Sequence, residues 1–141
     1  MELLALSTDL LDESLRFIVR ADPWNPIELN DFKKLNIEMT TESMSDLLVR
    51  CNVVYTDNIT SAAVDAYCLG RRVVSMLDPS MLNLSPLIDT DGVVFVSSPK
   101  ELAEALNGNS MSEHTKNEYF YLDPNLKKWE KLITGGNETE N

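Results

Sequence analysis

The chain has few basic residues and no long apolar run. Its 141 residues include 12 Lys or Arg against 23 Asp or Glu, which gives a formal net charge of −11. This balance repels phosphate backbones and anionic lipid, so nucleic acid and membrane surfaces are poor candidate partners. No apolar run approaches membrane-spanning length, and the first residues lack the basic start of a secretory signal. We therefore expect a cytoplasmic protein without a membrane span.

Residues suited to metal binding or covalent catalysis are also scarce. The two cysteines, Cys51 and Cys68, have no metal-ligand spacing and fall inside predicted regular structure, which indicates reduced thiols. His114 is the only histidine and lies in a polar segment. The sequence has no Gly-rich phosphate loop, zinc pattern, nucleophile elbow or paired carboxylates. It predicts no metal site, no bound cofactor and no identifiable catalytic residue.

Apolar segments alternate with helix signals along most of the chain. Strands are predicted over residues 15–20, 35–39, 52–56, 73–77 and 92–97, and helices over residues 3–13, 43–50, 61–69 and 98–106. Because the strands are apolar rather than alternating, they indicate a parallel sheet that is covered on both faces. The sequence therefore predicts an α/β fold, a three-layer Rossmann-like domain with a parallel sheet flanked by helices.

The domain is expected to be single and to cover residues 1–134, with a disordered tail over 135–141. A final helix is predicted to begin at Asp123-Pro124. The aromatic residues before and on this helix are expected to pin it to the domain. They are Tyr119, Phe120, Tyr121 and Trp129.

The most informative stretch runs from the third predicted strand, through the turn Asp57–Thr60, into a helix that begins at Ser61. Free backbone N–H groups at such a helix start suit a phosphate, and Asp65 could bind a ribose hydroxyl from the first turn. In the plainer interpretation, Thr60 or Ser61 only caps the helix, its alanines pack on the sheet and Asp65 complements the helix dipole. The residues alone leave these interpretations evenly balanced.

Two further loops follow strands. Arg20 precedes a proline-stiffened loop in which Trp24 could stack on a base, although an exposed arginine is more often solvated. The loop after the fourth predicted strand is expected at the same sheet edge as the turn before Ser61. Its polar side chains would either close over a ligand or form an ordinary connection. They are Asp78, Ser80, Asn83 and Ser85.

Three blocks of the chain carry a resemblance to a known family: DNITSAAVDAYCLGRRVVSMLDPSMLNLSPL, GVVFVSSPKELAEAL and YFYLDPNLKKWEKLI. They resemble the C-terminal, nucleotide-sugar-binding half of glycosyltransferases of the GT-B architecture, above all bacterial surface carbohydrate proteins of O-antigen and capsule biosynthesis. The resemblance implies a nucleotide-sugar donor as substrate, with Asn58, Thr60 and Ser61 at its diphosphate and Asp65 on its ribose. The implied donor-binding residues are Arg20, Asn58, Thr60, Ser61, Asp65, Asp78, Asn83 and Ser85.

The chain departs from the family pattern in one loop and in length. Related proteins often carry a Lys-Pro-His-Pro-like loop, whereas this chain reads Arg20-Ala21-Asp22-Pro23 and lacks the histidine. A two-domain enzyme needs roughly twice this length, since one domain takes about 100–200 residues. We therefore expect an isolated donor domain that is inactive without an acceptor-binding N-terminal half or partner subunit.

Two other functions remain open from the sequence. The same half would serve a sugar epimerase or a polyol-phosphate transferase of this architecture. A non-enzymatic interaction domain is the second alternative, since the leucines of the loop Leu82–Leu87 would suit a partner protein.

Overall fold

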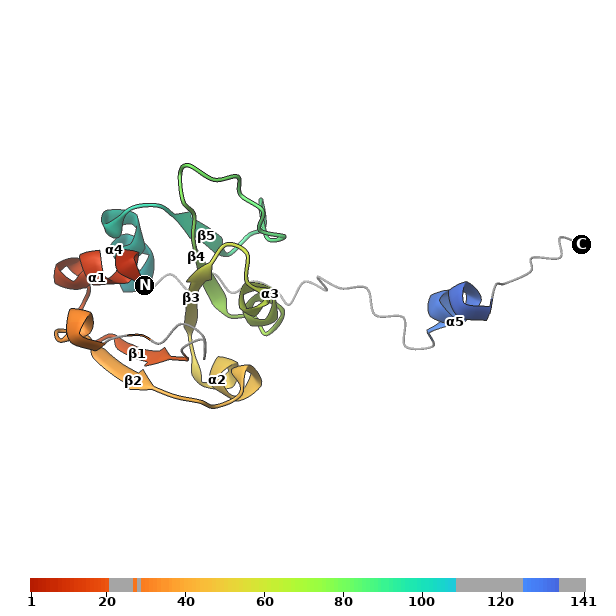
Figure 1. Cartoon of the computed structure of the whole chain (residues 1–141), viewed down its shortest axis with the longest axis horizontal. Helices are drawn as coiled ribbons and strands as arrows, with labels where there is room; N and C mark the ends of the chain where they lie inside the picture. The colour runs from red at the N-terminus through yellow and green to blue at the C-terminus, as the bar shows by residue number, and fades with distance from the viewer. Residues whose placement is uncertain (21–26, 28, 109–125, 135–141) are drawn as a thin grey trace, which may run out of the picture.

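Five short strands, all in parallel pairings, form the centre of the part of the chain that the computed structural model describes, residues 1–20, 27, 29–108 and 126–134. The strands are β1 (Arg16–Val19), β2 (Asn36–Met39), β3 (Val53–Asp57), β4 (Arg72–Met76) and β5 (Val93–Val96). The sheet is divided into two parts: β1 pairs with β2, and β4 lies between β3 and β5 (Figure 1). The predicted parallel pairing is confirmed.

Helices connect and cover the strands (Figure 1). They are α1 (Glu2–Leu6), α2 (Met44–Arg50), α3 (Ser61–Cys68), α4 (Pro99–Asn107) and α5 (Lys127–Thr134), with 3₁₀ turns η1 (Thr8–Leu10) and η2 (Leu29–Phe32). Gly70 ends the α3 segment at φ +72, a conformation that glycine adopts without a side-chain clash. Apart from α1 and the start of α5, the predicted helices are confirmed to within about two residues.

The first predicted helix is wrong beyond Leu6. The Ser7 hydroxyl donates to the carbonyl of Leu3 at 2.7 Å, and the Thr8 hydroxyl donates to that of Ala5 at 2.8 Å. Such side-chain hydrogen bonds compete with the continuing helix ladder. The chain therefore leaves the α-helix at Ser7 and makes the 3₁₀ turn η1 instead of running helically to residue 13.

The three-layer arrangement is visible in two consecutive residues of β4. Val74 is buried in one core with Leu4 of α1 and Leu102 of α4, whereas Val73 is buried in a second core with Leu48 of α2 and Ala66 of α3. Neighbouring residues of a strand point to opposite faces, so the strand lies between two helical layers. This arrangement is the predicted α/β fold, with parallel strands flanked by helices in a Rossmann-like manner.

Two side chains tie the end of α4 to distant segments. The Arg72 guanidinium donates to the carbonyls of Gly108 and Ala105, the latter at 2.6 Å, where the negative end of the helix dipole favours a cation. The Asn107 amide donates to the Leu10 carbonyl and accepts from the Asp12 N–H, both at 2.9 Å. The start of β4 and the η1 segment are therefore fixed to the same helix end.

Of the aromatic residues expected to pin α5, only Trp129 lies within the described residues. The indole of Trp129 is 62 % exposed, so it does not pin the helix to the described part of the domain. Tyr119, Phe120, Tyr121 and the Asp123-Pro124 start lie outside the described residues, as does the tail over 135–141.

Replacing a core leucine tests the placement of α4. Leu102 is fully buried, so we expect Leu102→Ala to lower the free energy of unfolding by about 2–5 kcal/mol in urea denaturation. Leu6 on α1 is 65 % exposed, and Leu6→Ala should stay within about 0.5 kcal/mol of the parent. Equal losses in the two variants would contradict the assignment of the core.

The start of α4 predicts a pH dependence. Glu101 accepts hydrogen bonds from the Ser97 N–H and hydroxyl and the Ser98 N–H, which lowers the pKa of its carboxyl below the ordinary 4.5. Its contribution is therefore complete above that ordinary value and is lost as pH falls through the folded pKa. Melting temperatures should separate the parent from Glu101→Gln at pH 7 and converge by about pH 3. Glu104→Gln, on the same helix, is the matched control and should show a smaller separation.

Candidate functional site

The predicted donor-binding residues other than Arg20 lie on or beside the carboxyl ends of β3 and β4. Because these strands are parallel neighbours, their following segments emerge at one edge of the sheet. From β3 the chain passes through Asn58 and Thr60 into α3, and from β4 it enters the loop that begins at Asp78. The edge is therefore shared as predicted, and the local hydrogen bonds decide what it offers a ligand.

The start of α3 is partly closed by its own cap. The Thr60 hydroxyl accepts from the Ala62 N–H at 3.1 Å and from the Thr56 hydroxyl at 3.5 Å, which links the helix cap to β3. The Ala63 N–H donates to the Thr60 carbonyl at 3.3 Å. Among the described residues the N–H of Ser61 has no acceptor. Of the first three backbone N–H groups of α3, only that of Ser61 is thus open to a ligand. The prediction that Thr60 caps the helix is confirmed.

Asp65 is the fifth residue of α3 and lies just beyond the first turn, which holds no acidic residue. Its side chain is exposed, as is that of Ser61, four residues earlier on the same helical face. The opposite face, with Ala63 and Ala66, is buried in the core shared with β4. The alanines therefore pack on the sheet, and Asp65 presents a carboxylate that has no partner among the described residues.

The loop after β4 uses its polar side chains to hold its own shape. Asp78 accepts from the N–H and hydroxyl of Ser80 at 2.8 and 2.7 Å, which lowers the pKa of its carboxyl. Asn83 accepts from the Ser85 N–H at 3.0 Å, and the buried Ser85 hydroxyl accepts from the Leu87 N–H at 3.2 Å. These Asx- and Ser-type turns order the loop, and they occupy three side chains that were predicted to contact the donor.

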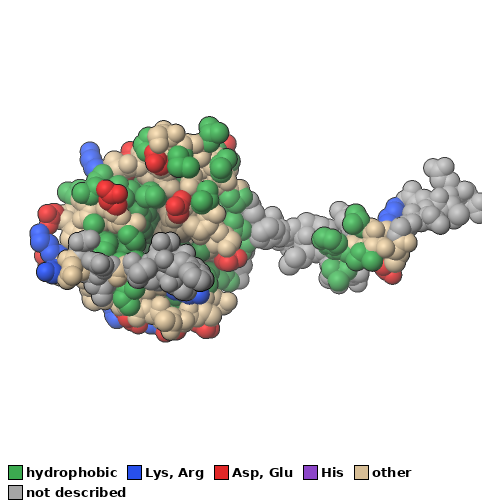
Figure 2. Space-filling model, viewed as in Figure 1, with side chains coloured by type: hydrophobic (Ala, Val, Ile, Leu, Met, Phe, Trp, Pro, Cys, Tyr) green, Lys and Arg blue, Asp and Glu red, His purple; other side chains and the backbone are tan. Residues whose placement is uncertain are grey.

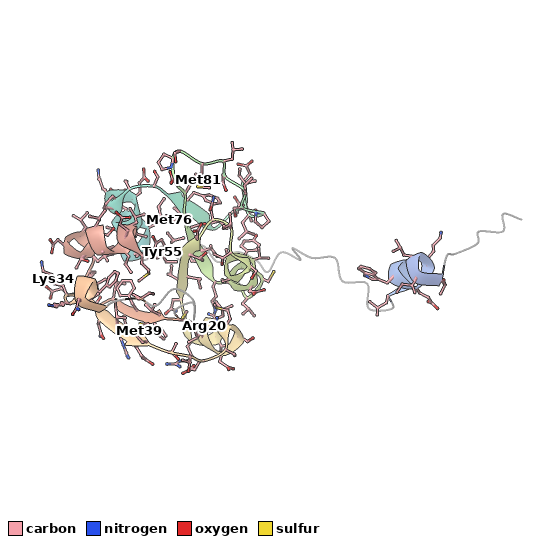
Figure 3. All side chains as sticks on the ribbon, viewed as in Figure 1. Arg20, Lys34, Met39, Tyr55, Met76 and Met81 are labelled. Carbon is pink, nitrogen blue, oxygen red and sulfur yellow. The ribbon has the colours of Figure 1, made fainter. Side chains whose placement is uncertain are left out.

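Arg20 is not brought to this loop. It follows β1 with an exposed side chain, and Tyr55 of β3 lies between Arg20 and Met81 in Figure 3. The Trp24 loop that follows Arg20 lies outside the described residues. The structure thus groups Asn58, Thr60, Ser61 and Asp65 around the start of α3, and separates Arg20 from the loop of Asp78, Asn83 and Ser85.

Ser75 is a buried polar residue beneath this edge that sequence reasoning missed. It is the register partner of Thr56, lies on the α3 side of β4 and is fully buried, yet its hydroxyl has no hydrogen-bond partner among the described residues. A buried hydroxyl without a partner is destabilising, and this one is closed to solvent beneath α3, so it belongs to the core and not to the exposed edge. The signal in the sequence was a lone serine inside the apolar strand Val73–Leu77.

Tyr55 carries the second buried hydroxyl without a described partner, on the opposite face of the sheet. Burial, and then the nearby charge of Asp57, raise the pKa of Tyr55 to about 12. The phenol is therefore protonated near neutral pH, and it does not serve as a general base there.

Hollows also occur at the opposite edge of the sheet, where β1 and β2 begin. One of about 560 Å³ is lined by Asp9, Asp12, Leu15, Lys34 and Asn36, among others. Lys34 pairs with Asp9 at 2.5 Å, with both side chains more than 70 % exposed, so the pair is worth little. Figure 3 shows Lys34 far from Arg20 and Met81, at the other side of the molecule.

Comparison with known proteins adds no relative: no family model, curated protein or solved structure matches this chain. Within the described ranges, no helix is both long and apolar enough to cross a membrane. In the same residues, no three His, Cys, Asp or Glu side chains are grouped so as to hold a metal ion. The evidence on function therefore comes from the groups at the carboxyl ends of β3 and β4.

The cap of α3 can be tested by three substitutions. Thr60→Ala should lower the free energy of unfolding by about 0.5–2 kcal/mol, because the Ala62 N–H loses its acceptor. Thr60→Ser keeps an acceptor and should retain most of the stability. Ser61→Ala removes an exposed hydroxyl and is the matched control. No loss in Thr60→Ala would contradict the cap and leave that hydroxyl available to a ligand.

Proposed function

We propose that this chain is the nucleotide-sugar donor-binding domain of a glycosyltransferase-like protein in bacterial surface polysaccharide biosynthesis, acting in the cytoplasm. A partner domain or subunit would supply the acceptor site and the catalytic base. The chain's own contribution would be binding: the helix start holds the departing diphosphate, and the sugar carbon is presented to an acceptor hydroxyl.

The observation that carries this proposal is the polar group at the junction of β3, β4 and α3. It combines the open N–H of Ser61 with the carboxylate of Asp65, which is exposed on the same helical face. An open N–H at the positive end of a helix suits an anion, and a free carboxylate suits the hydroxyls of a ribose or sugar. A nucleoside diphosphate carries both kinds of group.

Calorimetry with uridine, guanosine, adenosine and cytidine diphosphates tests the proposal. We expect weak binding of at least one nucleotide and no sugar transfer by the chain alone. Asp65→Asn should weaken that binding about 10- to 150-fold, because a charged hydrogen bond contributes about 1.5–3 kcal/mol. Asp9→Asn, at the opposite edge of the sheet, should leave the affinity unchanged.

Absence of binding by all four nucleotides at millimolar concentration would overturn the proposal. Equal weakening of the binding by Asp65→Asn and Asp9→Asn would contradict a binding site at the start of α3. Ser75→Ala removes a buried hydroxyl that has no described partner, so it should raise the thermal stability and leave the affinity unchanged.

A second function, protein interaction, is favoured by one observation. The loop after β4 exposes Met81, Leu82 and Leu84 to solvent, although its polar side chains hold it in a defined shape. Large apolar side chains that are gathered on an ordered surface are typical of a binding interface.

A further inference from the structure

Among the residues that the structure describes, two uncovered apolar surfaces have neighbouring charges of opposite sign. The first is the apolar stripe of α5, formed by Leu126, Trp129, Leu132 and Ile133. These side chains are between 60 % and 78 % exposed. Within α5 the spacing of three and four residues places Leu132 and Ile133 on the same side of the helix as Trp129, and Leu126 directly precedes the helix.

The second surface, here called the loop patch, consists of Met81, Leu82, Leu84 and Ile88. These side chains are between 51 % and 81 % exposed. Figure 2 shows hydrophobic side chains gathered over this part of the molecule, with acidic side chains among them. The patch has a fixed base, because Leu87 is fully buried in the core with α3 and Ser85 holds the Leu87 N–H.

Charge distinguishes the loop patch from other exposed apolar residues. Residues 73–99 contain no Lys or Arg, and the loop carries Asp78, Asp89 and Asp91. Helix α5 has the reverse balance, with Lys127, Lys128 and Lys131 against Glu130, in a chain whose formal net charge is −11. A basic amphipathic helix therefore complements an apolar surface with an acidic rim.

We propose that two copies of this chain associate by exchanging α5, so that the stripe of each copy packs on the loop patch of the other. Every described side chain on α5 is exposed, so no described segment of the same chain covers the stripe. A second copy supplies the surface that α5 lacks. The contact is the same in both directions, as a two-fold symmetric dimer requires.

Exchange of α5 in both directions also increases the area of the interface. One stripe on an eight-residue helix covers little area alone, and stable interfaces bury about 1,200–2,000 Å² in total. Exchange of both helices doubles the apolar area that one contact buries. Trp129, at the centre of the stripe, is the residue type most often found to anchor such interfaces.

Analytical ultracentrifugation of the full chain, without added nucleotide, tests the exchange. We expect the mass to rise from that of the 15.9 kDa chain to twice this value as the protein concentration is raised. Leu82→Asp in the loop patch and Leu132→Asp in the stripe should each abolish the dimer. Leu6→Asp, the same change at an exposed leucine outside both surfaces, should leave it intact.

An equimolar mixture of Leu82→Asp and Leu132→Asp is the decisive measurement. One intact stripe and one intact loop patch then remain between the two copies, so the mixture should form a dimer although neither variant does alone. We expect this dimer to need a higher concentration than the parent, since only one of its two contacts is made. Circular dichroism confirms that the variants, both at exposed positions, remain folded.

Four outcomes would overturn the proposal: a parent that stays monomeric at all concentrations, a dimer that survives Leu82→Asp, a dimer that survives Leu132→Asp, or a mixture that stays monomeric. A surviving dimer in the second or third case would indicate helix-to-helix or loop-to-loop contact. Because no nucleotide is present, failure here leaves the proposed donor binding untouched.

Discussion

Burial of β4 on both faces is the constraint on which the other elements depend. Val73 and Val74 contact different helical layers, and β3 and β5 occupy both edges of the strand. Branched apolar residues suit such a position because they fill space on a pleated surface and need no hydrogen bond. Ser75 is the exception, since a buried hydroxyl without a partner costs about 1–3 kcal/mol. Its side chain lies beneath α3 and is closed to solvent, so this cost falls on the stability of the core.

At the carboxyl ends of β3 and β4, some polar groups form structural hydrogen bonds and others remain open to solvent. Thr60 caps α3, and Asp78, Asn83 and Ser85 fold the loop after β4 into successive turns. Groups used in this way fix the positions of their neighbours. They leave the Ser61 N–H and the Asp65 carboxylate open near α3, and they hold Met81, Leu82 and Leu84 in solvent. One edge can therefore present a polar site and an apolar surface side by side.

The fold was predictable from the sequence because its signals are local. Ser98 with Pro99 and Glu101 forms the expected capping box at the start of α4, and the apolar strands pair in parallel. The end of α1 was missed because Ser7 and Thr8 bond back to carbonyls, a choice that helical spacing does not reveal. In the candidate site, the shared edge followed from topology. Whether a hydroxyl caps, folds a loop or stays unpaired depends on neighbours distant in sequence, as Ser75 shows through its register with Thr56.

The anchoring of α4 by Asn107 has a consequence for architecture. Its amide bonds to Leu10 and Asp12 bring the last helix of the sheet-bearing region against the first turns of the chain (Figure 1). Entry and exit points of that region consequently lie next to each other. A unit built in this way can be placed within a surface loop of a host polypeptide, because the host backbone needs to open only by a small gap to admit it.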